Sequence, residues 1–196
     1  NELLNVTDAD LQKSYSAILF GPGLEKSELN FKVLSKLIAT QMKMLIDAQG
    51  LNMIAERKWK LHGNCVVTPH SGELSRLIGL TAIEIDQDKI TACQKFCHEY
   101  QSMILAKGAK SLLQAFDKSY IINSGNKALA KAGTGDVLAG IISSYMAQGL
   151  SVEKAVCLGT YIHGAMADVW IKKGNLDSSL LASDLVQALK SFDLNN

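Results

Sequence analysis

Apolar residues occur along the chain in two patterns, as short continuous runs and as longer stretches in which they recur every three or four positions. The short runs predict buried β-strands, and the longer stretches predict helices with one apolar face. The predicted strands are Ala17–Phe20, Met44–Asp47, Cys65–Thr68 and Met103–Ala106, followed by a strand pair at Leu112–Phe116 and Tyr120–Asn123 that turns at Asp117 and Lys118. The predicted helices are Lys26–Gln41, Gly50–Arg57, Glu84–Tyr100, Gly135–Gln148, Val152–Lys172 and Ser183–Ser191.

The alternation of strands and helices predicts β-α-β units, and therefore an α/β fold in which helices cover both sides of a mainly parallel sheet. Ligands bind such sheets beyond the carboxyl ends of the strands. The unusual residues of this chain stand at those positions. They are Gly21-Pro22-Gly23, Asp47-Ala48, Pro69-His70-Ser71-Gly72-Glu73 and Lys107-Gly108-Ala109, each directly after a predicted strand. We therefore expect one active-site rim built from several loops.

The composition narrows the class of protein. Of 196 residues, 47% are hydrophobic and 20% are charged, which allows a substantial core and argues against a disordered chain. The net charge of +1 argues against a broad nucleic-acid surface. The longest uncharged stretch, Val137 to Val152, is too short and too polar to span a membrane. Without a signal-peptide pattern or Cys-x-x-Cys spacing, the chain is predicted to be a reduced, cytoplasmic protein.

Two of the cysteines have a spacing that is compatible with metal binding. Cys93 and Cys97 lie four residues apart on a predicted helix and are followed by His98. A metal site is conceivable at this spacing, but two small apolar residues on one helix face explain it equally simply. We assign no metal ligand from the sequence.

The strongest local motif is Gly133-Thr134-Gly135-Asp136, which opens an apolar helix. Glycines let the backbone approach a ligand, and a helix start offers unpaired N–H groups with a partial positive charge. Together they form an anion hole suited to a phosphate in transfer. Asp136 could accept the proton of a substrate hydroxyl, which is the base role in phosphoryl transfer. The alternative is an ordinary glycine-rich helix start with Asp136 as its cap.

Positive charge is concentrated just upstream of that motif. Five lysines and two aspartates lie between residues 107 and 136. Four of the lysines, Lys107, Lys110, Lys127 and Lys131, could meet nucleotide phosphates, or the run could form a solvated charged face. Lys107-Gly108-Ala109 is the more specific signal, because Gly108 permits a close approach of the backbone.

The loop Thr68-Pro69-His70-Ser71-Gly72-Glu73 carries two side chains, His70 and Glu73, that could contact a polar substrate or the water shell of a cation. Alternatively, Ser71 caps a helix that begins near Glu73. The two interpretations are compatible. His163 lies in an apolar helix and is interpreted as a satisfied core histidine.

Several motifs follow one another in a fixed order. They are Gly21-Pro22-Gly23-Leu24, Asp47-Ala48-Gln49-Gly50-Leu51-Asn52, Thr68 to Glu73, Lys107-Gly108-Ala109, Asn123-Ser124-Gly125-Asn126 and Ala132-Gly133-Thr134-Gly135-Asp136, with Tyr161-Ile162-His163-Gly164 downstream. Together they resemble the NAD(P)H-hydrate dehydratase family, whose ribokinase-like domain was formerly called a carbohydrate kinase. The resemblance covers nearly the whole chain. Gly-Thr-Gly-Asp is shared with other ribokinase-like kinases, whereas the Pro-His-x-Gly-Glu loop points to the dehydratases.

The resemblance implies a ribokinase-like three-layer α/β/α fold and a repair activity, the ADP- or ATP-dependent dehydration of hydrated NADH or NADPH. Phosphorylation of the hydrate hydroxyl, with Asp136 as the base, would turn a poor leaving group into a good one, and the ring nitrogen would then expel phosphate. Magnesium would accompany the nucleotide phosphates. The sequence does not distinguish ADP from ATP.

The same resemblance implies the site residues. Asp136 is the catalytic residue. The substrate-binding residues are Gly21, Gly23, His70, Glu73 and Asp136. The nucleotide-binding residues are Lys107, Gly108, Ala109, Lys110, Ser111, Asn123, Asn126, Gly133, Thr134 and Gly135.

The chain departs from the family pattern at a few positions. Ser71 replaces a second proline, Gln49 replaces a carboxylate, and Ser124 replaces a threonine. None of these changes removes the base or the anion hole. The family's domain begins further upstream, so we expect residues 1–196 to be its C-terminal two thirds, without its N-terminal strands. A missing N-terminal segment, and an epimerase domain, are therefore possible.

Two other functions stay open at this stage. One is a ribokinase-like small-molecule kinase acting on a vitamin or a sugar alcohol, and the other is a non-enzymatic nucleotide-binding or oligomeric scaffold. We expect a small-molecule substrate and a homo-oligomer, because helices such as Val152–Lys172 carry enough apolar residues to pack against a partner. We expect neither a nucleic acid nor a membrane as a partner.

Overall fold

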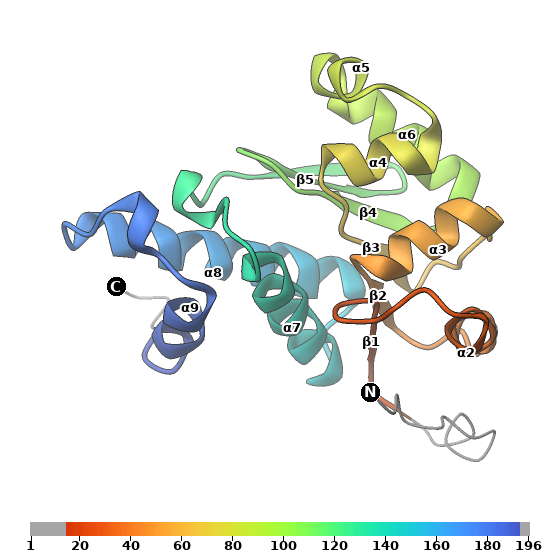
Figure 1. Cartoon of the computed structure of the whole chain (residues 1–196), viewed down its shortest axis with the longest axis horizontal. Coiled ribbons are helices and arrows are strands. Elements are labelled where there is room, and N and C mark those ends of the chain that lie inside the picture. The colour runs from red at the N-terminus through yellow and green to blue at the C-terminus, as the bar shows by residue number, and fades with distance from the viewer. Residues whose placement is uncertain (1–14, 193–196) are drawn as a thin grey trace.

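A computed structural model describes residues 15–192 of the chain (Figure 1). Within these residues one six-stranded sheet follows the order of the sequence. Its strands are β1 (Ile18–Phe20), β2 (Met44–Ile46), β3 (Cys65–Val67), β4 (Met103–Ala106), β5 (Ser111–Ala115) and β6 (Lys118–Ile122). Strands β1 to β4 are parallel, and β5 and β6 extend the sheet in antiparallel fashion. The predicted α/β class and mainly parallel sheet are confirmed.

Helices connect the parallel strands and cover both sides of the sheet. The α-helices are α2 (Glu28–Ala39), α3 (Gln49–Arg57), α4 (Ser71–Ile78), α5 (Ala82–Gln87), α6 (Lys89–Tyr100), α7 (Thr134–Ala147), α8 (Val152–Lys172) and α9 (Ala182–Leu189). Two 3-10 turns also occur: η1 (Lys127–Leu129) precedes α7, and η2 (Asp177–Ser179) follows α8. No helix within residues 15–192 is both long and apolar enough to cross a membrane.

The side chains of each buried strand alternate between two cores, as the two-residue period of a β-strand requires. In β2, Met44 and Ile46 face the core that contains helices α2 to α6, whereas Leu45 faces the core of α7 and α8. In β3, Val66 likewise faces α7 and α8. Figure 1 shows α7 and α8 lying together, away from α3 and α4. The result is a helix–sheet–helix sandwich of three layers.

One predicted helix is in fact two. The sequence predicted a continuous helix over Glu84–Tyr100, but the chain breaks at Asp88, where φ is −143° and ψ is 76°. The Asp88 carboxylate accepts a hydrogen bond from the Thr91 N–H at 3.0 Å and so starts α6 afresh. Thr81 and Glu84 form a capping box that starts α5 earlier than predicted. Apolar periodicity runs through the break, so only the caps signal it.

The turn between β5 and β6 also differs from the prediction. It was expected at Asp117 and Lys118, but Lys118 already pairs with Ala115 in the ladder. The turn therefore consists of Phe116, which has a φ of 54°, and Asp117. Phe116 is an unusual residue for the left-handed region, so turn propensity favoured the wrong pair.

The parallel strands set the position of the loops. Because β1 to β4 run in one direction, the residues that follow them lie at the same edge of the sheet. Gly21, Asp47, Thr68 and Lys107 are those residues. The fold therefore gathers the four loops that the sequence singled out.

Candidate active site

Lys107, directly after β4, lies at the centre of a charged cluster. Its Nζ lies 3.0 Å from Asp47 Oδ1 and 4.0 Å from Glu73 Oε2. Asp47 is only 2% exposed, so its carboxylate relies on this ammonium for charge compensation. The loops after three neighbouring strands thus bring together one cation and two carboxylates.

The start of α7 lies against this cluster. A Cβ atom built on Gly135 would lie 3.5 Å from Lys107 Nζ and 4.0 Å from Asp47 Oδ2. Gly133, whose φ is 83°, is the N-cap residue, and no side chain caps the helix. Within residues 15–192 no hydrogen-bond partner is found for the backbone N–H groups of Gly135 and Asp136. This uncapped helix start has the features of an anion site.

Asp136 does not act as a cap, which was the alternative interpretation of the motif. Its side chain is exposed in the first turn of α7, and no hydrogen bond or ion pair is found for its carboxylate in the described part of the chain. An exposed, unengaged carboxylate beside unpaired N–H groups can accept a proton from a group bound there.

Thr134 and His163 form the buried side of the helix start. The Thr134 hydroxyl donates to the carbonyl oxygens of Leu129 and Lys131, at 2.7 and 2.9 Å, and so ties down the loop that leads into α7. His163 is 5% exposed and hydrogen-bonds to the Thr134 backbone. Burial lowers the pKa of His163 to about 4, opposed by that hydrogen bond and assisted by the charge of Lys107. The imidazole is therefore neutral at pH 7.

The interpretation of His163 as a satisfied core histidine is only half right. The residue is buried, but its Nε2 has no hydrogen-bond partner among residues 15–192. Among the described residues, Thr68 Oγ1, Ser143 Oγ and Thr160 Oγ1 are also buried without a hydrogen-bond partner. Buried polar atoms without partners are uncommon. Thr68 directly follows β3 at the site, whereas Ser143 and Thr160 lie within α7 and α8.

The Gly21-Pro22-Gly23 turn packs against the Asp47 loop. A Cβ on Gly21 would lie 1.9 Å from the Asp47 carbonyl oxygen, so no side chain fits there. Ala48 has a φ of 48° and a ψ of −120°, a conformation that costs a residue with a side chain roughly 1–3 kcal/mol. This strained turn aims Asp47 back toward Lys107.

His70, and not Ser71, caps α4. The His70 Nδ1 accepts hydrogen bonds from the N–H groups of Gly72 and Glu73, at 3.0 and 3.4 Å. Glu73 Oε2 in turn accepts from the His70 N–H at 2.9 Å, which completes a capping box. Ser71 is the first helical residue, and its hydroxyl donates to Asp86. The His70 ring is 59% exposed, so its outer edge stays accessible to a ligand.

The Asn123–Asn126 loop is held by α8 instead of by the charged cluster. Asp168 accepts from the Gly125 N–H and from Asn126 Nδ2, both at 2.8 Å. Asn126 Oδ1 caps η1 by accepting from the Ala128 N–H at 3.0 Å. Both ends of the Asn126 amide are therefore engaged within the protein, whereas Asn123 is exposed.

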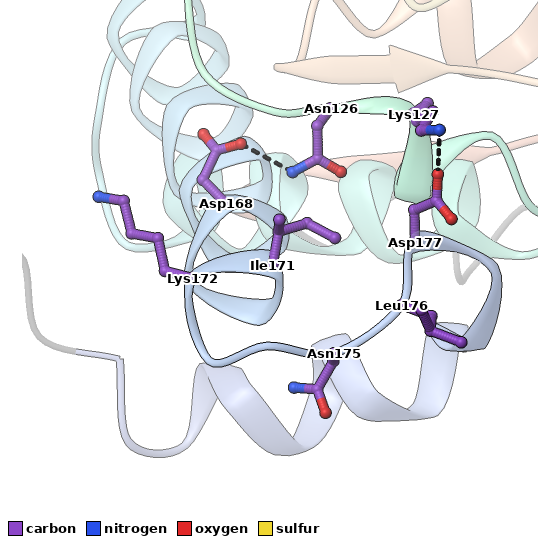
Figure 2. A pocket seen from close by; sticks show the side chains of 8 residues that line it. All are labelled: Asn126, Lys127, Asp168, Ile171, Lys172, Asn175, Leu176 and Asp177. Atoms are coloured by element: carbon purple, nitrogen blue, oxygen red, sulfur yellow. Dashed lines mark hydrogen bonds and ion pairs between the residues drawn. The ribbon is translucent and has the colours of Figure 1, made fainter.

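A pocket of about 570 Å³ lies beside this loop, at the C-terminal end of α8. Figure 2 shows Asn126 and Asp168 side by side on its wall, with the Lys127–Asp177 ion pair opposite. Its lining residues are Asn126, Lys127, Asp168, Ile171, Lys172, Asn175, Leu176 and Asp177. Of these, the sequence singled out Asn126 as a site residue and Lys127 as a possible phosphate contact, and Lys127 here pairs with Asp177.

The sequence predicted Asp47 on the active-site rim but gave it no role, and it missed two residues of this region. Asp168 and Lys89 stand inside helices with no local signal. Lys89 reaches the loop after β4, where its Nζ lies 3.2 Å from the Lys110 carbonyl oxygen.

No group of three or more His, Cys, Asp and Glu side chains in the described residues could hold a metal ion on its own. Cys93 and Cys97 are buried, and burial raises the pKa of their thiols to about 12 and about 11. They are therefore protonated apolar groups on the inner face of α6.

A mainly parallel sheet covered by helices on both sides, with a glycine-rich helix start beyond its strand ends, is the architecture of a ribokinase-like α/β protein. A ribokinase-like superfamily protein from Enterococcus faecalis has the same fold, with a TM-score of 0.78 and 26% identity over 90% of this chain and 62% of its own. More narrowly, the chain belongs to the NAD(P)H-hydrate dehydratase family, whose sequence profile matches residues 2–191.

Two relatives illustrate the family. The bifunctional NAD(P)H-hydrate repair enzyme Nnr of Escherichia coli is 38% identical over 174 residues, which is 88% of this chain and 33% of that protein. The ADP/ATP-dependent NAD(P)H-hydrate dehydratase of Bacillus subtilis, co-crystallised with ATP and Mg²⁺ and soaked with CoA, superposes with a TM-score of 0.80 at 27% identity, covering 93% of this chain and 68% of that one. The chain thus spans about a third of the bifunctional relative.

Proposed function

We propose that this chain carries the nucleotide-dependent dehydratase site of an NAD(P)H-hydrate repair enzyme. The observation that carries the proposal is the uncapped start of α7. There the exposed Asp136 and two unpartnered N–H groups lie beside Lys107 and two carboxylates. Such a site binds the phosphates of a nucleotide and holds a base next to the phosphoryl group in transfer.

The roles of the residues follow from this arrangement. Lys107 and the loop to Ser111, with the N–H groups at Gly135, bind the phosphates of ADP or ATP. Asp136 accepts the proton of the hydrate hydroxyl as that oxygen takes the terminal phosphoryl group. The nicotinamide ring nitrogen then supplies the electron pair that breaks the C–O bond and expels phosphate. Loss of a proton from the neighbouring ring carbon restores the double bond of NADH or NADPH.

The substrate side is formed by the remaining loops. Gly21 and Gly23 leave backbone surface for the hydrated dinucleotide, and the exposed edge of His70 faces solvent next to Glu73. Because the cap on α4 engages the Nδ1 of His70, the Nε2–H is the ring donor that remains for a substrate oxygen, and it lies 3.5 Å from Glu73 Oε2.

The carboxylates also suit Mg²⁺. This ion typically takes one or two protein carboxylates, with phosphate oxygens and waters completing its octahedron. Asp47 and Glu73, on either side of Lys107, provide that number, and a larger protein cage is not required. When bound, the ion would neutralise charge on the nucleotide phosphates.

The relatives support the choice of reaction and of nucleotide. The Escherichia coli protein is named as a repair enzyme for NAD(P)H hydrate, and the Bacillus subtilis protein as a dehydratase dependent on ADP or ATP. Coverage of 68% of the latter supports the expectation that residues 1–196 make up about two thirds of the domain. The buried, protonated cysteines are consistent with a cytoplasmic location.

The test is direct recovery of NADH. Hydrated NADH is incubated with Mg²⁺ and with ADP, ATP or no nucleotide, using the protein together with whatever sequence flanks these residues in its gene. We expect NADH absorbance to return only when a nucleotide is present, with one phosphate released per NADH formed. If neither nucleotide restores absorbance, the proposal is wrong. Accumulation of a stable phosphorylated alcohol would instead indicate a small-molecule kinase.

A further inference from the structure

Lys89, the first residue of α6, reaches behind the loop that joins β4 to β5. Its Nζ lies 3.2 Å from the carbonyl oxygen of Lys110 and 3.5 Å from that of Lys107. A Cβ atom on Gly108 would lie 3.0 Å from the same Nζ. A side chain at position 108 would therefore crowd the ammonium of Lys89, which would have to shift to make room.

This contact fixes the orientation of the peptide groups in the loop. In a trans peptide the C=O and N–H bonds point in opposite directions. Because Lys89 holds the Lys107 carbonyl, the N–H of Gly108 points away from Lys89. No hydrogen-bond partner within the described residues is found for the N–H groups of Gly108, Ala109 and Lys110. The Gly108 N–H, which points away from Lys89, is thus available to an anion on the other side of the loop.

The break at Asp88 puts the lysine in this place. Asp88 caps α6, so Lys89 begins the helix, and side chains of a helix lean toward its N-terminus. The ammonium is about half buried, and burial lowers the pKa of Lys89, while the nearby Asp86 carboxylate opposes that shift. The cation is thus partly withdrawn from water and directed at two carbonyl oxygens.

We propose that Lys89 is a positioning residue, which holds the Lys107–Ser111 loop so that its N–H groups face the nucleotide phosphates. The inference rests on the proposed function, since it assigns the loop to a nucleoside di- or triphosphate. It also gives a second explanation for glycine at position 108. The missing side chain leaves room for Lys89 on one side of the loop, as well as for a ligand on the other.

Substitution of Lys89 by methionine tests the role. Lys89→Met keeps the length of the side chain and removes its charge and donors. Binding of ADP and ATP with Mg²⁺ is measured by titration calorimetry, and turnover with hydrated NADH gives KM and kcat. We expect the nucleotide Kd and KM to rise about tenfold while kcat changes less than threefold, as for other residues that orient a binding group. Lys89→Arg keeps the charge and should recover part of the affinity.

Lys95→Met is the matched control. Lys95 lies on the same helix, and its Nζ donates to the Ile78 carbonyl oxygen at 3.0 Å, far along the chain from the loop. It makes the same kind of contact without touching residues 107–111, so its loss should leave nucleotide affinity unchanged. If both variants bind nucleotide like the unmodified protein, or both lose the same affinity, the inference is overturned.

Two further variants keep the test decisive. If Lys89→Met does not fold, Lys89→Gln retains one donor with a shorter reach, and an unchanged Kd in this variant contradicts the inference. Gly108→Ala should weaken nucleotide binding in the normal background and much less in Lys89→Ala, because the added methyl group then displaces nothing. Equal losses in both backgrounds would mean that Gly108 serves the ligand alone. Failure of the unmodified protein to bind any nucleotide would overturn the proposed function instead.

Discussion

Two regions of this protein use polar side chains in opposite ways. At the strand ends, Lys107 lies between two carboxylates, the start of α7 has no side-chain cap, and Thr68 and His163 each keep a buried polar atom without a partner among residues 15–192. At the Asn123–Asn126 loop, the polar groups are paired. Asp168 takes two N–H donors, and Ser124 Oγ donates to the Tyr161 carbonyl oxygen at 2.9 Å.

The difference separates binding from scaffolding. A polar group that is already paired with the protein gains little from a ligand, whereas an unpaired one gains a hydrogen bond that it lacked. The strand-end region therefore keeps unpaired N–H groups that can bind phosphate and an unpaired carboxylate that can bind a reacting hydroxyl. In the Asn123–Asn126 loop, most polar groups already form hydrogen bonds within the protein, and these bonds fix the shape of the loop. Substitutions in the first region should change activity most, and those in the second should change stability most.

The largest effect is expected at Asp136. Asp136→Asn keeps the size of the side chain and removes its basicity, so kcat for the proposed dehydration should fall by about a hundred- to ten-thousandfold. Nucleotide affinity should stay within a few-fold, because the N–H groups of α7 are unchanged. Steady-state turnover and calorimetry on the same preparation measure both. Unchanged turnover would remove Asp136 as the base.

Lys107→Met should have the next largest effect, and it should change both the nucleotide Kd and the free energy of unfolding. Loss of a charged contact to phosphate should raise the nucleotide Kd roughly ten- to a hundredfold. The buried Asp47 carboxylate also loses its cation, which should cost about 3 kcal/mol of unfolding free energy. Adding Asp47→Asn should restore stability without restoring affinity. A double variant that recovers both would show that the pair is only structural.

The buried imidazole predicts a pH dependence of stability. The pKa of His163 in the folded protein is about 4, below its ordinary value of 6.5, so between these values the unfolded chain binds a proton that the folded protein excludes. This stability is complete above pH 6.5 and is lost as the pH falls toward 4, by about 3 kcal/mol in total. Denaturant unfolding from pH 7 to 4 measures it. The same slope in His163→Gln would contradict the assignment.

Asp168→Asn should have the smallest of these effects. It tests most directly whether the Asn123–Asn126 loop serves stability and not catalysis. The amide keeps one acceptor oxygen, so one of the two hydrogen bonds from Gly125 and Asn126 is lost, at about 2 kcal/mol for a bond to a charged group. We expect a lower unfolding midpoint with kcat changed less than threefold. A loss of turnover larger than the loss of stability would show that this loop belongs to the reaction as well.

Local patterns were enough to predict most of the framework. The apolar runs gave β1 to β4 within a residue or two at each end, because buried parallel strands contain little except apolar residues. The residues after those strands followed from topology, since parallel strands end at one edge. The glycine-rich helix start at Gly133–Asp136 was also predicted, because its glycines and the helix adjoin in the chain.

Contacts between distant residues were not visible in that way. Asp47 and Lys107 are sixty positions apart, and their pairing depends on the neighbouring strands β2, β3 and β4. The capping role of His70 was missed because serine is the commoner cap residue. The break at Asp88 was missed because hydrophobic periodicity ignores caps. Each of these depends on geometry that a one-dimensional pattern does not contain.

The contact between Lys89 and Gly108 also bears on how this sequence can change over evolutionary time. The two positions occupy the same space from opposite sides, so a substitution at one alters which residues are acceptable at the other. A relative with a short side chain in place of Lys89 can accept alanine in place of Gly108 freely, whereas in a relative that keeps the lysine its ammonium must shift to make room. The two positions should therefore covary within the family, linking a residue of helix α6 to one of the loop after β4.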